Sequence, residues 1–294
     1  MPTMVAQDRS APEAVRVWLL GDFSVSVGER KVDETAWRLR KAASLMKLLT
    51  IAPGHRLHRE QAMDLLWPDS GKKAASNNLS QTLHVARRTL TSDPAEGSRY
   101  LTSKDEALVL CPGGELWVDV DAFEVAAAAA RRARDAGAYR AALELYSGEL
   151  LPGDRYEEWA EGRRQELRRT WLSLHLELAR VYEGRGEYEE GIEALQRVLS
   201  EEPTNEEVHA TLMRLYAFSE RREEALAQYE RLREVLSGEL DEEVSSTTER
   251  LREEIAAGTF PPASPPSRRR RSPPTRASTT CRPRELASWA ASTR

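Results

Sequence analysis

Cysteine and long apolar runs are scarce in this sequence of 294 residues, which contains only Cys111 and Cys281. Two thiols so far apart provide neither a disulfide framework nor the closely spaced ligand pairs of a zinc site. No run approaches the roughly 18 apolar residues of a membrane-spanning helix, and the N-terminal residues lack the apolar core of a signal peptide. We therefore expect a reduced, cytoplasmic chain that has no membrane among its partners.

The motifs of common enzyme sites are missing as well. Gly71-Lys72-Lys73 lacks the upstream glycine of a phosphate-binding P-loop, and no HExxH, CxxC or GxSxG motif occurs. The five histidines are scattered, and His55 and His58 fit a solvated turn better than a phosphate contact. The residues before the first expected strand are too few for a phospho-acceptor receiver domain. We predict that the protein is not an enzyme and uses no cofactor and no metal.

Lysine is absent after residue 104, and this marks a strong asymmetry of charge along the chain. Residues 1–118 carry a net charge of +2, residues 119–260 a net charge of −14, and residues 261–294 a net charge of +7. A mildly basic segment can approach a polyanion, whereas a strongly acidic one is repelled by it. The asymmetry predicts a domain boundary near residue 118 and places any nucleic-acid contact in the first domain.

Hydrophobic patterning divides the first domain into β-rich and helical stretches. Alternating apolar runs separated by glycine predict two strands, at residues 15–20 and 23–27. Apolar residues at helical spacing, followed by proline, predict three helices, at residues 37–51, 59–67 and 74–90. Residues 100–111 then read as a β-hairpin around a charged turn. Strands, three helices and a hairpin form the α+β order of a winged helix-turn-helix domain.

The expected helix at residues 74–90 has two unlike faces. Leu79, Leu83 and Leu90 fall on one side, which we assign to the core. The opposite side has no acidic residue and consists of Asn77, Gln81, His84 and Arg88, flanked by Lys73, Asn78 and Ser80. Asparagine and glutamine can bond an adenine edge and arginine a guanine edge. An ordinary solvated face is the alternative, but other solvated helices of this chain are rich in glutamate and aspartate.

Basic residues at the start of this helix suit contact with phosphate, because helix amides also point outward there. The predicted DNA-contacting residues are Lys72, Lys73, Asn77, Asn78, Ser80, Gln81, His84, Arg87, Arg88 and Lys104.

Three groups of residues carry a family resemblance: Lys41 with Leu48-Leu49, Arg59-Glu60 with Leu65-Leu66-Trp67, and Asn77-Asn78-Leu79 with Leu83, Arg87-Arg88 and Leu90. Their order resembles the OmpR-type winged helix, in the version found in the SARP family of actinobacterial transcription activators. The resemblance implies that helix 74–90 enters the major groove and that loop 68–73 faces RNA polymerase. It also implies that hairpin 100–111 touches the neighbouring minor groove or backbone. The acidic tip Lys104-Asp105-Glu106 departs from the family pattern and weakens the case for that last contact.

The second domain shows an internal repeat of 34 residues. His175, Leu178 and Tyr182 recur as His209, Leu212 and Tyr216. A helix–turn–helix unit of this length is typical of tetratricopeptide (TPR) repeats, which stack to bury a continuous core. We therefore expect an all-α TPR-like domain, in which the paired histidines pack in the interior. The expected helices include residues 138–151 and 157–183, and Gly137 is expected to end the helix before them.

This second segment resembles the bacterial transcriptional activator domain that follows the winged helix in SARP regulators, and residues 119–123 match the usual junction. The tandem order predicts domains at residues 15–118 and 119–257, followed by a disordered Pro/Arg-rich tail at 258–294. The resemblance implies binding to double-stranded promoter DNA, recruitment of RNA polymerase, and a homodimer or partner docking through the repeats. Larger SARP-like regulators carry an NTPase domain after such a linker, so we expect this chain to match the N-terminal part of one.

Two other functions remain open on the sequence. The repeats would bind a protein partner in an adaptor whose winged helix is only structural, and a nucleotide-handling enzyme is a weaker third option. The run of four arginines at residues 268–271 fits three interpretations: attraction to DNA, contact with the acidic repeat face, or no role.

Overall fold

The computed structural model describes residues 13–260 except 33, 92, 94 and 95, so the predicted tail beyond residue 260 lies outside the described residues. The chain opens with a four-stranded sheet in the order β3-β2-β1-β7. Its strands are β1 (Val15–Trp18), β2 (Ser24–Val27), β3 (Arg30–Val32) and β7 (Leu116–Val118). β1 pairs antiparallel with β2 and parallel with β7, so the sheet joins the start of the first domain to its end.

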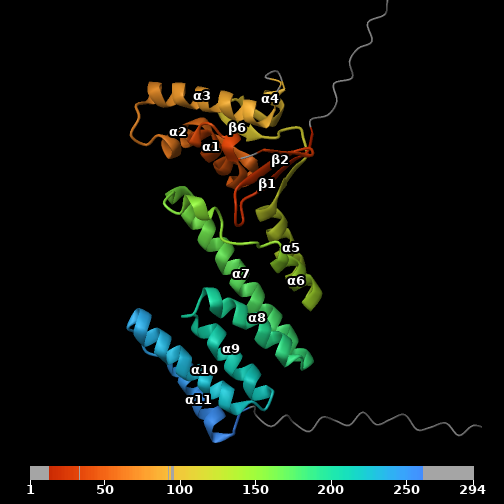
Figure 1. Ribbon diagram of the computed structural model, residues 1–294, viewed down its shortest axis with the longest axis vertical. Helices are drawn as coiled ribbons and strands as arrows, with labels where there is room; N and C mark the ends of the chain where they lie inside the picture. Colours follow the sequence, from red (N-terminus) through yellow and green to blue (C-terminus); the bar gives the residue numbers. More distant parts are fainter. Residues whose placement is uncertain (1–12, 33, 92, 94–95, 261–294) are drawn as a thin grey trace, which may run out of the picture.

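Four helices and a second, three-stranded sheet complete the described part of the first domain (Figure 1). The helices are α1 (Arg40–Ile51), α2 (Arg59–Leu66), α3 (Lys72–Leu90) and the short α4 (Gly97–Tyr100), with 3-10 turns η1 (Glu34–Ala36) and η2 (Pro53–His55). The second sheet has the order β4-β6-β5, with β4 (Arg56–His58), β5 (Leu101–Lys104) and β6 (Ala107–Leu110). The predicted winged-helix class is confirmed.

Several boundaries in this domain differ from the prediction. The first helix begins at Arg40, because η1 occupies the preceding segment and Trp37 leaves the helix to pack on Phe23, with ring centroids 5.6 Å apart. The third helix begins two residues early, at Lys72. The three-residue strands β3, β4 and β7 were not predicted, because an alternation of apolar residues cannot be recognised over three positions.

Paired helices form the rest of the described chain (Figure 1). They are α5 (Asp119–Ala133), α6 (Ala136–Glu144), α7 (Glu158–Arg185), α8 (Tyr188–Glu201), α9 (Glu206–Phe218), α10 (Arg222–Val235) and α11 (Ser246–Ala257), with short turns η3 (Pro152–Asp154) and η4 (Leu236–Leu240). Each helix packs on the next, and the repeated positions Leu178, Leu212, Tyr182 and Tyr216 are buried. The predicted all-helical repeat class is confirmed.

The prediction was wrong about the first helix pair of the repeats. Gly137 does not end a helix; it lies in the first turn of α6, where the Asp135 carboxylate accepts hydrogen bonds from the Gly137 and Ala138 amides. α6 then ends at Glu144, well before residue 151. After α6 the chain turns and bends until Leu150, which forms a β-bridge with Leu20 in the first domain. A tertiary pairing therefore overrides the local helical pattern.

A buried carboxylate fastens the two domains together. Asp119, the first residue of α5, is 3% exposed and accepts hydrogen bonds of 2.8 Å from the backbone amides of Leu19 and Leu20. Close by, Lys47 of α1 pairs with Asp154 at 2.5 Å, and both side chains are largely buried. One continuous hydrophobic cluster runs through both domains. The winged helix and the first repeats therefore share a fixed junction rather than a free linker.

Both repeated histidines are buried, as predicted, but they differ in their contacts. The ring of His209 is 2.9 Å from the Pro203 carbonyl through Nε2 and 2.7 Å from the Gln228 amide through Nδ1. His175 is 6% exposed, and its Nδ1 has no hydrogen-bond partner in the described structure. Burial lowers the pKa of both rings, that of His175 to about 4.

We expect acid to destabilise the repeats through His175. Its pKa in the fold, about 4, is below the ordinary value of 6.5, so the folded state favours the neutral ring. This stability is fully present above about pH 6.5 and is lost as the pH falls toward 4; the loss between pH 7 and pH 5 is about 2 kcal/mol. Urea unfolding at the two pH values should show a smaller pH dependence for His175→Phe than for the wild type. An unchanged pH dependence would contradict the assignment.

In the described part of the chain, no helix combines the length and apolarity required to cross a membrane. Among the same residues, no group of three or more His, Cys, Asp or Glu side chains lies close enough together to hold a metal ion.

Candidate nucleic-acid interface

One face of α3 is free of the rest of the molecule. The side chains of Asn77, Gln81, His84 and Arg88 are exposed, and within the described chain they form no hydrogen bond or ion pair. We call these four residues the α3 stripe. Leu79, Leu83 and Leu90 on the other face are buried against the domain core. α3 packs on α1, α2, α4 and β5, and it lies at the end of the molecule opposite α11 (Figure 1). The repeats therefore leave the α3 stripe uncovered.

The N-terminus of α3 has the properties of an anion-binding site. Its N-cap is Gly71, which has no side chain to satisfy the first amides, and its first turn contains no acidic residue. Lys72 and Lys73 lie in this turn, and both side chains are exposed to solvent. The Lys72 ammonium is 3.6 Å from the Glu60 carboxylate, and both partners of this ion pair are exposed. The unpaired amides and the positive end of the helix dipole attract phosphate together.

The remaining predicted residues of α3 are less open. Asn78 is half-buried, and the exposed Ser80 donates its hydroxyl to the Ser76 carbonyl at 2.9 Å. Arg87 is half-buried and donates from Nε to the Leu101 carbonyl at 2.7 Å. The Arg87 Cβ packs closely on Gly97: a Cβ added at position 97 would lie only 2.7 Å from it. Arg87 thus connects α3 to the wing, and its place is beside the α3 stripe rather than within it.

The hairpin β5–β6 is held against α2. Asp105 and Glu106 both have positive φ, typical of a two-residue hairpin turn. The Glu106 carbonyl accepts a 2.8 Å hydrogen bond from the Arg59 amide, and its carboxylate lies 3.8 Å from the Arg59 guanidinium. Lys104 is exposed beside them. Because Arg59 offsets one of the two acids at the tip, the wing is less repulsive to DNA than its sequence suggests.

Residues 118–256 match the family model of the bacterial transcriptional activator domain. The chain carries a bacterial transcriptional activator domain. Its fold is similar to that of a solved structure described as "Mycobacterium tuberculosis EmbR in complex with low affinity phosphopeptide". That match has a TM-score of 0.69 at 20% identity; it covers 84% of this chain and 66% of that one, slightly less than two thirds. No curated protein matches the sequence significantly.

These matches agree with the predicted arrangement, in which a winged-helix domain is followed by a bacterial transcriptional activator domain. The family match begins at Val118, the last residue of β7. The activator domain therefore starts within the sheet that it shares with the winged helix.

The two histidines before α2 have different structural contacts, one with the activator domain and one within the winged helix. His55 lies 3.1 Å from the Asp121 carboxylate in α5, and this contact raises the pKa of its ring. His58 caps α2, because its Nδ1 accepts a hydrogen bond from the Glu60 amide. A solvated turn was therefore the wrong interpretation for His55, which is only 22% exposed, whereas His58 is exposed to solvent as well as capping α2. His55 connects the winged helix to α5 and His58 caps α2, so neither residue belongs to the α3 stripe.

Sequence reasoning did not find Arg59 as a support of the wing or Gly71 as the open cap of α3. The Arg59 contact depends on β4, which is too short to be recognised, and it joins residues 47 positions apart. Gly71 could have been found, since a glycine before a helix leaves its first amides without a side-chain partner.

Proposed function

We propose that this member of the SARP-type regulators binds specific DNA sequences through α3 and activates transcription. The observation that carries the proposal is the α3 stripe, which consists of four exposed side chains able to read bases and contains no acid. It lies on a helix at the end of the molecule opposite α11 (Figure 1). A winged helix offers its third helix to the major groove, where amide and guanidinium groups distinguish base pairs. The adaptor alternative gives no reason for such a surface.

The surrounding residues fit contacts with the DNA backbone. Lys72, Lys73 and the free amides of the first turn of α3 lie where a phosphate would pass the helix N-terminus. Asn78, Ser80 and Arg87 flank the α3 stripe, and Lys104 extends from the wing. We assign phosphate contact to the lysines and base contact to the α3 stripe.

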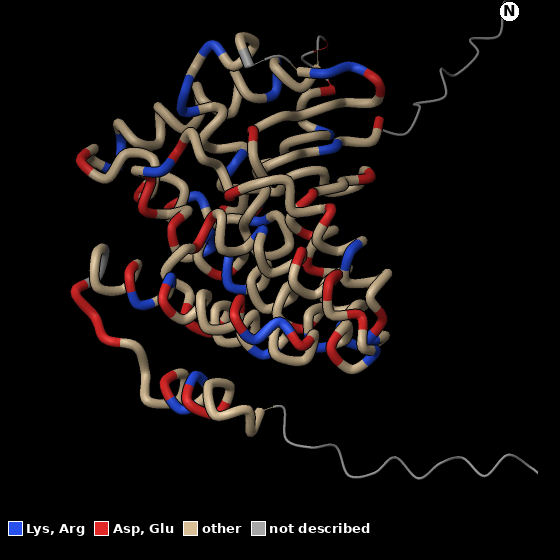
Figure 2. The backbone as a smooth tube through the Cα atoms, turned by 60° about the horizontal axis from the view of Figure 1, so that its bottom comes forward, with Lys and Arg blue, Asp and Glu red and all other residues tan. Residues whose placement is uncertain are grey.

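The acidic repeats suit a role with proteins rather than DNA. Acidic residues recur along the repeat helices (Figure 2), and residues 119–260 have a net charge of −14. We propose that residues 15–118 act as the DNA-binding domain and residues 119–257 as the domain for dimerisation or partner docking. The family of the activator domain supports recruitment of RNA polymerase, for which segment 68–73, ending in the first residues of α3, is the candidate surface.

Selection of bound sites from random double-stranded DNA with the purified chain tests the proposal most directly. Enrichment of one sequence, or of two copies at a fixed spacing, is the expected result. Recovery of unselected sequence together with no measurable affinity at about 50 mM salt would instead favour the adaptor.

Lys72 and Lys73 should contribute to binding without regard to sequence. The logarithm of the binding constant falls with the logarithm of salt concentration by about 0.9 for each phosphate neutralised. We expect Lys72→Ala with Lys73→Ala to reduce this slope by about 1 to 2 and to weaken all DNA sequences equally. The matched control is Arg132→Ala with Arg169→Ala, two exposed cations of the repeats. Equal slopes for the lysine variant and the wild type would remove these residues from the interface.

A further inference from the structure

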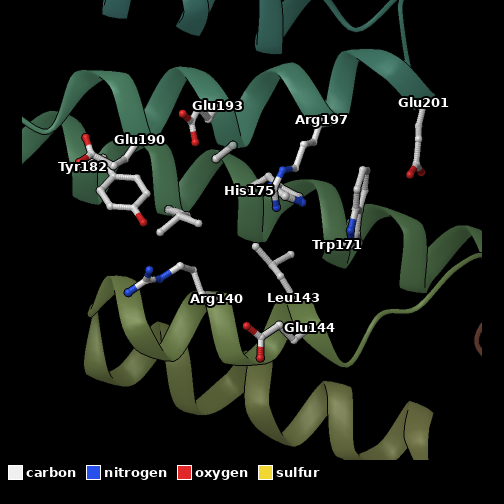
Figure 3. A pocket seen from close by; sticks show the side chains of 12 residues that line it. Arg140, Leu143, Glu144, Trp171, His175, Tyr182, Glu190, Glu193, Arg197 and Glu201 are labelled. Carbon is white, nitrogen blue, oxygen red and sulfur yellow. The ribbon is translucent and has the colours of Figure 1, made fainter.

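A groove of about 420 Å³ lies between the first helices of the repeats, far from α3. α7 forms its floor with Trp171 and Tyr182, while α6 and α8 form its two walls (Figure 3). Glu190 and Glu201 stand at the two ends of the α8 wall, about 17 Å apart along the helix axis. An extended peptide rises about 3.3 Å per residue, so about five residues span this length. A compact small molecule would leave much of the groove empty.

The floor of the groove presents two polar atoms that lack a partner. Tyr182 is 6% exposed and Trp171 is 7% exposed, and neither the Tyr182 hydroxyl nor Nε1 of Trp171 forms a hydrogen bond in the described structure. Unlike Nδ1 of His175, both atoms are open to solvent. The Tyr182 hydroxyl points into the groove, whereas that of the equivalent residue, Tyr216, accepts a 3.0 Å hydrogen bond from the Gln196 amide (Figure 3). Both free atoms can donate, so they suit an occupant that offers carbonyl oxygens, as a peptide backbone does.

The rim of the groove favours a basic occupant. Four carboxylates border it, and two arginines oppose them: Glu144, Glu190, Glu193 and Glu201 against Arg140 and Arg197. None of these six side chains has an ion-pair partner in the described part of the chain. Other arginines of the repeats do form such pairs, for example Arg221 with Glu189. The carboxylates outnumber the guanidiniums and are not neutralised by neighbours, so they attract a cationic ligand.

We propose that this groove binds an extended, basic peptide segment of a partner protein. The arginine or lysine side chains of the peptide face the free carboxylates, and its backbone carbonyls accept hydrogen bonds from Tyr182 and Trp171. Successive side chains of an extended chain point to opposite sides, so neighbouring basic residues reach Glu144 on α6 and Glu190 on α8. The inference rests on the partner-docking role proposed for residues 119–257 and specifies the chemistry of that partner.

The consequence is a separation of partners by charge. The carboxylates that attract a basic peptide repel the phosphates of DNA, while the α3 stripe contains no acid. The groove and α3 therefore select different ligands on one chain, and the protein can hold both at once.

Fluorescence anisotropy with a model peptide tests the groove. The probe is a fluorescein-labelled peptide in which alanine and arginine alternate over about seven residues, enough to span the groove. It is titrated with the full chain at about 50 mM salt, where charge attraction is only partly screened. We expect saturable binding with a dissociation constant below about 1 mM. A peptide in which glutamate replaces arginine should not bind.

Two variants test the proposed contacts separately. Glu190→Lys with Glu193→Lys replaces two exposed, free carboxylates by cations and should weaken binding roughly tenfold. Tyr182→Phe removes only a hydroxyl and should weaken binding by about 2- to 10-fold, the contribution of one hydrogen bond.

Matched controls change the same groups outside the groove. Glu223→Lys with Glu249→Lys alters two exposed glutamates of α10 and α11 that have no ion-pair partner in the described chain. Tyr188→Phe removes a hydroxyl from a ring that stacks on Phe218 and does not line the groove. We expect both controls to bind the probe within about twofold of the wild type.

Three results would overturn the proposal. One is the absence of saturable binding up to about 1 mM. Another is an equal loss of affinity in the groove variants and their controls, which would indicate general attraction to an acidic protein. The third is competition by spermine at the same concentration as the unlabelled peptide, which would indicate a site for small cations. Since no DNA is present, none of these results bears on the role of α3.

Discussion

Replacing Arg88 or Gln81 by alanine should weaken binding to the selected DNA site by about 5- to 150-fold while leaving nonspecific binding almost unchanged. A well-formed contact between such a side chain and a base edge contributes about 1–3 kcal/mol of discrimination. Both side chains are exposed on the α3 stripe and have no partner in the described protein, so their removal costs the fold little. Fluorescence anisotropy with the selected site and with a shuffled site would separate the two effects.

Matched variants in the repeats control for general changes in charge or polarity. Arg132→Ala and Gln165→Ala remove the same side chains from exposed positions of α5 and α7. We expect them to leave the affinity for the selected site within about twofold of the wild type, since surface substitutions away from a site have small effects. If Arg88→Ala and Gln81→Ala also bound every sequence like the wild type, α3 would not be the reading helix.

Asp119→Ala should lower the free energy of unfolding by about 3 kcal/mol. The substitution leaves the buried amides of Leu19 and Leu20 without an acceptor, and each such group costs about 1–3 kcal/mol. Burial raises the pKa of the Asp119 carboxyl, while its hydrogen bonds from the backbone amides act against this rise. Urea denaturation followed by circular dichroism at neutral pH measures the loss.

Asp121→Ala is a close control, because it removes the same side chain two positions later in α5. The Asp121 side chain is 48% exposed and pairs with His55, an arrangement that contributes less than about 1 kcal/mol. Similar losses for the two variants would show that Asp119 is an ordinary surface acid and that the junction lies elsewhere. A large loss for Asp119→Ala alone would support rigid coupling of the winged helix to the activator domain.

The spacing of apolar residues predicted the three main helices of the first domain and the buried face of α3. The spacing of Leu79, Leu83 and Leu90 placed one face of α3 in the core and left the α3 stripe outside, and both placements agree with the structure. That α3 binds DNA stays a prediction. The spacing did not indicate that Arg87 is half-buried and donates to the Leu101 carbonyl, because that contact depends on where the wing packs; its contact with DNA stays a prediction.

The sequence by itself determined the class of each domain, the core faces of the main helices and the division of charge between the domains. These follow from residues within a few turns of one another. Tertiary structure alone decided the end of α6, the burial of Asp119 and the groove around His175. Asp119 meets Leu19 across 100 positions of sequence, and Leu20 pairs with Leu150 across a still longer interval. Contacts of this range arise when packing brings distant segments together, and no local spacing of residues encodes them.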